Sequence, residues 1–181
     1  LINNEWEEMA RIADSIPSSW IQNAHDHLKK NGWGRTIATP YMLHHVTQWN
    51  VNQASAILIT TEDVAEIYSK GSDGFIFPNA LIESNAVIPL SERRQLHHCN
   101  GLHHIKNEYV RLTGMNPSES QFHELYSCFP IAVRLQREAF ELGKRPGSIT
   151  GGMTFAGGPY NNFMLQGLSQ LAKQVRDSHT T

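Results

Sequence analysis

The sequence predicts a layered α/β fold, a mixed β-sheet with helices on its faces. Two observations predict it. Apolar runs of strand length alternate with amphipathic segments over residues 54–175, and those segments carry residues that typically start and stop helices. At 181 residues and 40% hydrophobic content, the chain is also long enough to bury a core. In such folds, ligands bind where strands hand over to helices.

The first thirty residues are predicted to form two amphipathic helices, separated at Pro17. Apolar residues recur at the three-and-four spacing of a helix on both sides of this break: Trp6, Met9, Ile12, Ala13 and Ile16, then Trp20, Ile21, Ala24 and Leu28. Each helix therefore has an apolar stripe that must be covered.

The middle of the chain is predicted to contain two strands, each followed by a helix. "ASAILITT", residues 54–61, is almost uniformly apolar, which predicts a buried strand. Acidic residues open and Lys-Gly closes residues 62–71, as in a short helix. "GFIFPNALIES", residues 74–84, predicts a strand with an edge or bend at Pro78, and a helix follows over 91–113.

The C-terminal third repeats the strand-to-helix pattern twice. "FHELYSCF", residues 122–129, predicts a strand that leads into a helix over 130–143, which opens with proline and closes on glycine. "GSITGGM", residues 147–153, is strand-like, and a last helix is predicted over 159–175.

Charge and composition exclude several classes of protein. Fifteen basic and seventeen acidic residues give a net charge of -2, which provides no basic field for nucleic acid. No apolar run reaches the roughly 18 residues of a membrane span, and the acidic N-terminus is unlike a signal peptide. Two cysteines are too few for a disulfide framework. We expect a cytoplasmic protein with no nucleic-acid or membrane partner.

Cys128 lies where a predicted strand meets a helix N-terminus. Aligned N–H groups there can stabilise a thiolate, as in nucleophilic cysteines. The alternative is a small apolar packing residue. By strand alternation Tyr126 points to the same face, so both side chains line a pocket or both face the core.

A second predicted junction between a strand and a helix is rich in glycine, with Gly151-Gly152 and Gly157-Gly158 followed by Pro159. Glycine permits close backbone approach and positive φ, and proline presets a first helical turn. Free N–H groups here could cradle an anion or oxyanion, but the loop lacks the Lys and Ser/Thr of a Walker loop. A tight glycine turn is the alternative.

The histidine-rich stretch "HHCNGLHH", residues 97–104, raises the possibility of a metal site. On a helix, Cys99 and His103 stand four residues apart on one face, a spacing that zinc or nickel accepts. The alternative is a solvated histidine-rich face. We expect the latter, with no metal.

Three motifs together resemble the thiolase superfamily, in its sterol-carrier-protein-type and acetyl-CoA-acetyltransferase-like branch: "QWNVNQASAILI", "ELYSCFPIAV" and "SITGGMTFAGGPYNNF". The resemblance spans about residues 36–176. It implies a thiolase-like fold with three parts: residues 1–39 resemble the end of the loop domain, 40–61 the last strand region of the N-terminal half, and 62–181 a C-terminal domain without its final strands.

The chain departs from the thiolase pattern at its catalytic positions. Gly158 stands where the family has a histidine, and glycine cannot move a proton. Tyr126 stands where the family has an Asn or His that holds a water. The family's nucleophilic cysteine would precede residue 1, and a further catalytic cysteine would follow the last helix. We therefore expect a portion that is incomplete relative to a full thiolase and not catalytically competent alone.

The resemblance implies acyl-CoA acyltransferase chemistry of the acetyl-CoA acetyltransferase type, in lipid metabolism. A coenzyme A thioester would be substrate or ligand, with no covalently bound cofactor. Tyr126 and Cys128 are the implied catalytic residues. The implied pocket residues are Trp49, Gly151, Gly152, Gly157, Gly158, Pro159 and Asn161.

The resemblance also implies partners and leaves an alternative open. Members of this branch form homo-oligomers, usually dimers, and often pair with a small partner protein. The alternative is a non-catalytic acyl-CoA-binding or assembly module that keeps the thiolase fold.

Overall fold

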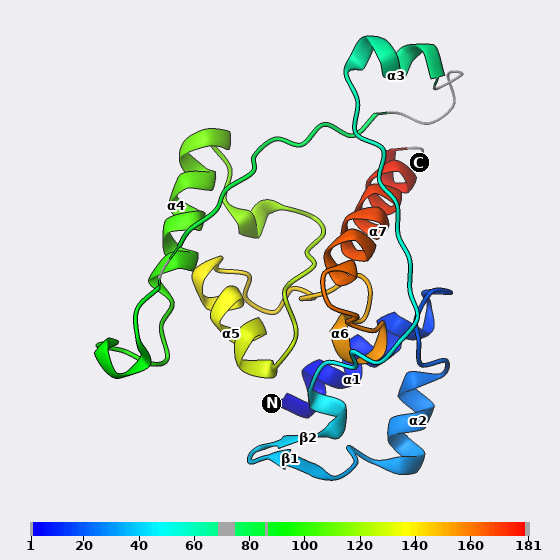
Figure 1. Ribbon diagram of the computed structural model, residues 1–181, viewed down its shortest axis with the longest axis vertical. Helices are drawn as coiled ribbons and strands as arrows, with labels where there is room; N and C mark the ends of the chain where they lie inside the picture. The colour runs from blue at the N-terminus through cyan, green and yellow to red at the C-terminus, as the bar shows by residue number, and fades with distance from the viewer. Residues whose placement is uncertain (1, 69–74, 86, 180–181) are drawn as a thin grey trace.

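The computed structural model describes residues 2–68, 75–85 and 87–179, and this part of the chain is rich in helices (Figure 1). The helices are α1 (Ile2–Asp14), α2 (Ala24–Asn31), α3 (Glu62–Tyr68), α4 (Asn100–Thr113), α5 (Pro130–Ala139), α6 (Gly152–Phe155) and α7 (Asn162–His179). Single 3-10 turns cover Leu43–His45, Leu90–Glu92 and Pro117–Glu119. The described strands are β1 (Thr36–Ala38) and β2 (Tyr41–Met42), which pair antiparallel.

The core gathers where α1, α2, α5 and α6 meet. Trp6 on α1 and Phe155 on α6 are almost completely buried, as is Val133 on α5. The Trp6 indole Nε1 donates to Thr154 Oγ1 at 3.2 Å, so its polar edge is satisfied inside the core. The predicted apolar stripe of the first helix is confirmed, because Trp6, Met9, Ala13 and Ile16 are all buried.

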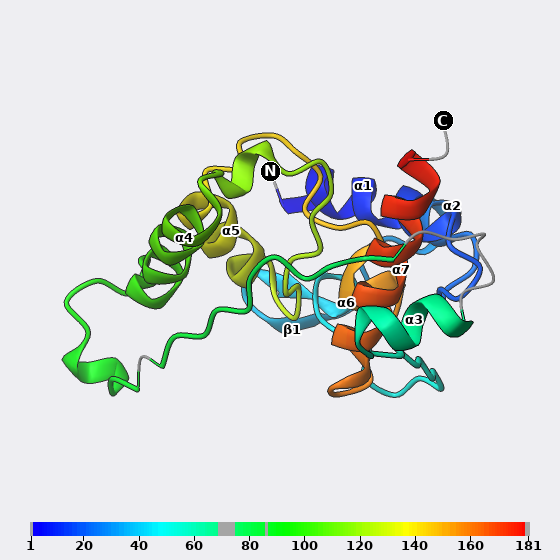
Figure 2. The same cartoon turned by 90° about the horizontal axis from the view of Figure 1, so that it is seen from above.

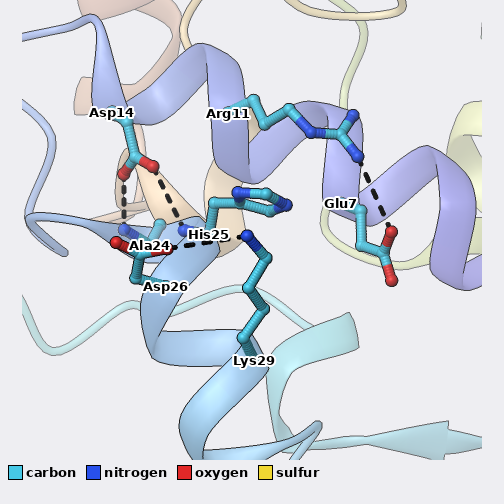
Figure 3. Close-up of polar contacts among 7 residues, drawn as sticks. All are labelled: Glu7, Arg11, Asp14, Ala24, His25, Asp26 and Lys29. Atoms are coloured by element: carbon cyan, nitrogen blue, oxygen red, sulfur yellow. Dashed lines mark hydrogen bonds and ion pairs between the residues drawn. The ribbon is translucent and has the colours of Figure 1, made fainter.

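Asp14, at the end of α1, holds the start of α2 (Figure 3). Its carboxylate accepts hydrogen bonds from the backbone N–H groups of Ala24 and, at 3.2 Å, His25. These are first-turn N–H groups with no partner inside the helix, and a negative charge beside them also suits the helix dipole. The two predicted N-terminal helices are thus confirmed, and α2 begins at Ala24 rather than before Trp20.

A largely buried ion pair joins α1 to α5. Glu5 Oε1 lies 2.6 Å from Arg137 Nε, and both side chains are about 15% exposed. A shielded pair of this kind fixes the two helices relative to each other, since removing either partner would leave the other charge buried without compensation.

Helices α4 and α5 lie side by side in both views (Figures 1 and 2). Lys106 on α4 contacts the Glu141 carboxylate just after α5, at 2.5 Å. No helix in the described part of the chain is long and apolar enough to cross a membrane.

The predicted mixed sheet is not confirmed in the described residues, where the sheet consists of β1 and β2. Residues 54–61, 75–84, 122–129 and 147–151 form no strand. The apolar run 54–61 is also not buried, since Leu58 and Ile59 are each 88% exposed. A strand needs a ladder of hydrogen bonds to a neighbour. The described residues show only single backbone bonds at these runs, such as Leu125 N to Gly147 O at 2.9 Å. Residue 74, the first of its predicted strand, lies outside the described residues.

The helix predictions are confirmed with shifted ends. Helix α3 occupies the predicted position from residue 62, and the predicted residues 69–71 lie outside the described part. Helix α4 begins at Asn100 rather than at residue 91. Helix α7 begins at Asn162 rather than at Pro159, because Tyr160 adopts φ 49° and turns the chain before the helix starts.

Two histidines beside the β1–β2 hairpin predict a loss of stability at acidic pH. Burial lowers the pKa of His45, and burial with the nearby His27 and His45 lowers the pKa of His44. The unfolded chain, with histidine pKa near 6.5, therefore binds protons before the folded chain does. Stability present above that value is lost as the pH falls through it.

We expect the melting temperature to drop between about pH 7.5 and about pH 5.5, and to drop less in His45→Gln. An exposed histidine provides the control: His104→Gln should retain the full drop. Equal slopes for wild type and His45→Gln would show that His45 does not carry the effect.

Candidate functional site

Three segments that are far apart in the sequence converge at the predicted site. Thr47 N donates to Cys128 O at 3.1 Å, and Gln48 N donates to Met153 O at 3.0 Å. Gly158 N in turn donates to Gln48 O at 2.8 Å. The segment 46–53, drawn in cyan beside α6 in Figure 1, is therefore bonded both to the segment before α5 and to the glycine-rich stretch around α6.

Tyr126 and Cys128 come together, as their spacing predicted, although the segment that carries them is not a strand. A hydrogen bond to the Cys128 side chain, then burial, raises the pKa of Tyr126. Tyr126 therefore keeps its proton at neutral pH and can donate a hydrogen bond. Its backbone is clamped by the Gln136 side chain on α5, which accepts from Tyr126 N at 3.0 Å and donates to Tyr126 O at 2.8 Å.

Cys128 lies two residues before the first residue of α5, Pro130, and is half-buried. This is the position at a helix N-terminus that the sequence predicted. The adjacent Ser127 faces inward and is fully buried, and its Oγ accepts from Met153 N at 2.9 Å. The segment thus directs Ser127 into the core and leaves Tyr126 half exposed.

The glycine-rich stretch 151–158 is buried throughout, and its N–H groups already have acceptors at several positions. Gly151 N and Gly152 N both donate to Ser148 Oγ at 2.9 Å. Gly158 N is bonded to Gln48 O. These N–H groups hold the loop to the protein interior rather than presenting it to a ligand.

Gly158 has no room for a side chain. A Cβ at this position would lie 2.8 Å from Met153 Cε and would also collide with Thr47 Oγ1. The Thr47 hydroxyl is buried, has no hydrogen-bond partner among the described residues and lies where a Cβ of residue 158 would be. The space next to this backbone is therefore filled by neighbouring side chains, and a histidine here would require the 46–53 segment to move.

The remaining predicted pocket residues lie at the surface. Trp49 is 60% exposed and meets Tyr160 edge-on, with ring centroids 5.7 Å apart. Tyr126 meets Phe163 in the same way at 6.0 Å. We call Trp49, Tyr126 and Tyr160 the aromatic face. Pro159 is half-buried and Asn161 is exposed in the turn that carries Tyr160.

Sequence reasoning missed a buried carboxyl group, Glu124, that organises the glycine-rich loop. It accepts hydrogen bonds from Ile149 N at 2.9 Å, Thr150 N at 3.0 Å and the hydroxyl groups of Ser148 and Thr150. Burial raises the pKa of Glu124, and these hydrogen bonds oppose the rise. An acidic residue inside an otherwise apolar predicted strand was the available signal.

Comparison with solved structures finds the same fold in a larger protein. The crystal structure of a monomeric SCP2-thiolase like protein type 1 from Mycobacterium smegmatis matches 97% of this chain with a TM-score of 0.74 and 24% sequence identity. The chain therefore has an SCP2-thiolase-like fold. It spans 40% of the length of that solved chain. A scan of protein-family models and a search of curated proteins find no match.

Proposed function

We propose that this chain is a thiolase-like polypeptide that binds acyl-CoA thioesters and does not complete acyl transfer by itself. The packing around Gly158 supports the second half of this proposal. The position of the family's acid–base histidine carries no side chain, and Met153 and Thr47 fill the space beside it. General acid–base catalysis from this position is therefore absent.

The aromatic face supports the first half of the proposal. Exposed aromatic rings offer rigid contact area for an adenine ring or a pantetheine arm. Tyr126, whose pKa is raised, provides a hydroxyl donor for a thioester carbonyl. Cys128 lies next to it at the N-terminal end of α5, so the reacting end of a thioester would lie beside Tyr126 and Cys128.

Within a longer protein, we propose that this chain forms one wall of the acyl-thioester pocket of an acyltransferase of the acetyl-CoA acetyltransferase type. The nucleophile would come from elsewhere in that protein. The buried loop 151–158 then acts as the floor that holds Tyr126, Cys128 and Trp49 in place, since its hydrogen bonds reach both of their segments.

Calorimetric titration with acetyl-CoA tests the binding site. We expect saturable binding that is weakened about three- to tenfold by Tyr126→Phe, the effect of one lost hydrogen bond. Trp49→Ala should weaken it by at least about tenfold, because a whole aromatic contact is removed. Tyr109→Phe, which deletes the same atom on α4, is the matched control and should bind like wild type. Equal losses in Tyr126→Phe and Tyr109→Phe would rule out the aromatic face.

A second candidate is a non-catalytic assembly module, favoured by the exposed apolar side chains of the 57–90 region. Five of the described ones are at least 74% exposed: Leu58, Ile59, Ile67, Leu81 and Val87. Exposed apolar side chains mark interaction surfaces when they gather in one patch. We propose a second copy of this chain as the partner. Sedimentation equilibrium measures whether the chain self-associates. Self-association, together with no heat of binding in the acetyl-CoA titration, would favour this candidate over the first.

A further inference from the structure

The histidine-rich stretch, expected to be a solvated face, instead contributes to a cluster of metal-ligand groups. His98 lies just before α4, His103 lies in its first turns, and Glu138 lies in the last turn of α5. One candidate ligand atom from each of these three side chains lies within 4.8 Å of the other two. This cluster is separate from the aromatic face and from the glycine-rich loop.

We propose that His98, His103 and Glu138 form a binding site for a divalent transition metal of the zinc class. Two imidazole nitrogens and one carboxylate oxygen are a ligand set that Zn²⁺ accepts, with a water completing a tetrahedron. The site would link the start of α4 to the end of α5. It goes beyond the proposed function and does not depend on it.

The distance between His98 and Glu138 is close to that of a loaded site, and all three ligand atoms lie within 4.8 Å of one another. Ligand atoms around tetrahedral zinc are separated by about 3.4 Å, from metal–ligand bonds of about 2.1 Å. His98 Nδ1 already lies 3.7 Å from Glu138 Oε1. The Glu138 side chain is 57% exposed, so it can rotate toward the ion without disturbing the core. The closure needed is a side-chain adjustment rather than a backbone movement.

The two histidine rings show the rearrangement that binding would require. His98 and His103 are stacked with centroids 4.2 Å apart and a 22° interplanar angle. Stacked rings direct their lone pairs along parallel planes, so both rings must turn for the lone pairs to converge on one ion. Metal binding therefore breaks the stack, which makes the imidazole signals a direct spectroscopic readout.

The surroundings give the cluster an entry path and a fixed frame. A hollow of about 500 Å³ opens beside it, with Glu92, His98 and Cys99 on its wall. The positive charges nearby are Arg93 and Arg94 on the same wall, and Lys106 one turn along α4, which is already paired with Glu141. The Lys106–Glu141 pair also joins α4 to the residues just after α5.

The pairing of Cys99 with His103, which the sequence raised as the less favoured possibility, does not form part of this cluster. Cys99 is the N-cap residue of α4 with an extended backbone, so it is not part of the helical face that carries His103. Its sulfur is outside the group of three converging ligand atoms.

Titration with Zn²⁺ alone, in calorimetry at about pH 7.5 where imidazoles are neutral, tests the site. We expect one ion per chain, and a loss of at least about tenfold in affinity for His103→Ala and for Glu138→Gln. The stretch itself offers matched controls, because His97 and His104 are exposed and lie outside the cluster. His97→Ala and His104→Ala should bind within about twofold of wild type.

Proton NMR of the imidazole groups gives a second readout that does not depend on affinity. On addition of Zn²⁺, the His98 and His103 signals should shift together and the His97 and His104 signals should stay in place. Circular dichroism confirms that each variant is folded, and Glu138→Gln, at an exposed position, tests the site if His103→Ala unfolds. Absence of saturable binding would overturn the proposal. So would equal losses in His97→Ala and His103→Ala, the pattern of adventitious binding to an exposed histidine-rich surface.

Discussion

Gly151→Ala is expected to destabilise the fold by about 3 kcal/mol or more, and to lower the melting temperature by about 6–12 °C. Gly151 has φ 97°, which side chains adopt only with strain. A Cβ at this position would also lie 2.7 Å from Ala13 N and Met9 O on α1. Both atoms are backbone, so neither can move without shifting the helix.

Gly114→Ala separates the strain of a side chain at positive φ from the collision of a Cβ with α1. Gly114 has φ 73°, and no atom lies within 4 Å of where its Cβ would be. This variant should cost only about 1 kcal/mol, the strain alone. Thermal unfolding of both variants by circular dichroism measures the difference. Equal melting temperatures for the two variants would show that the close approach of Gly151 to α1 does not contribute to the stability of the fold.

Glu124→Ala is expected to have the second large effect, a loss of about 3 kcal/mol or more in the free energy of unfolding. Its carboxylate accepts from two backbone N–H groups and two hydroxyl groups. Its removal would take away the acceptor of Ile149 N and would leave Thr150 N with only its bond to Ser148 Oγ at 3.1 Å. Gly167 on α7 leaves the space that Glu124 occupies, since a Cβ there would lie 3.0 Å from Glu124 Cγ. The Glu124 side chain therefore packs against α7 while its carboxylate bonds to residues 148–150.

Glu124→Gln is the matched control and should cost less than about 1 kcal/mol. A glutamine oxygen can accept from Ile149 N, Thr150 N and the Ser148 hydroxyl, as Glu124 Oε2 does. Its amide can donate to the Thr150 hydroxyl oxygen. Chemical denaturation at neutral pH measures both variants. A glutamine variant as unstable as the alanine variant would show that the charge, rather than the hydrogen-bond pattern, holds the loop.

The sequence predicted the helices because their signals are local. Apolar spacing and an opening proline act within one helix, and α1 and the start of α5 at Pro130 lie where these signals placed them. Helix α5 ends at Ala139, before the predicted closing glycine at residue 143. The contact between Tyr126 and Cys128 was also predictable, since two residues apart in extended chain point the same way.

The sheet was not predictable from the same kind of signal. An apolar run such as 54–61 indicates a surface that favours burial, but a strand also needs a neighbour in the folded chain. The described structure provides none for this run. The role of Glu124 depends on a partner loop about 25 residues away, and no spacing rule connects the two. The collision at Gly158 likewise depends on Thr47, which lies more than a hundred residues earlier.

One experiment on the chain incubated with acetyl-CoA tests the central claim most directly. Equilibrium dialysis measures the bound ligand, and chromatography of the same sample measures the released coenzyme A. The account predicts saturable binding with no release of coenzyme A above the protein-free control, because Gly158 leaves the site without an acid–base group. Release of many equivalents of coenzyme A per chain, abolished in Cys128→Ser and retained in Cys99→Ser, would contradict it and would identify the chain as a working acyltransferase.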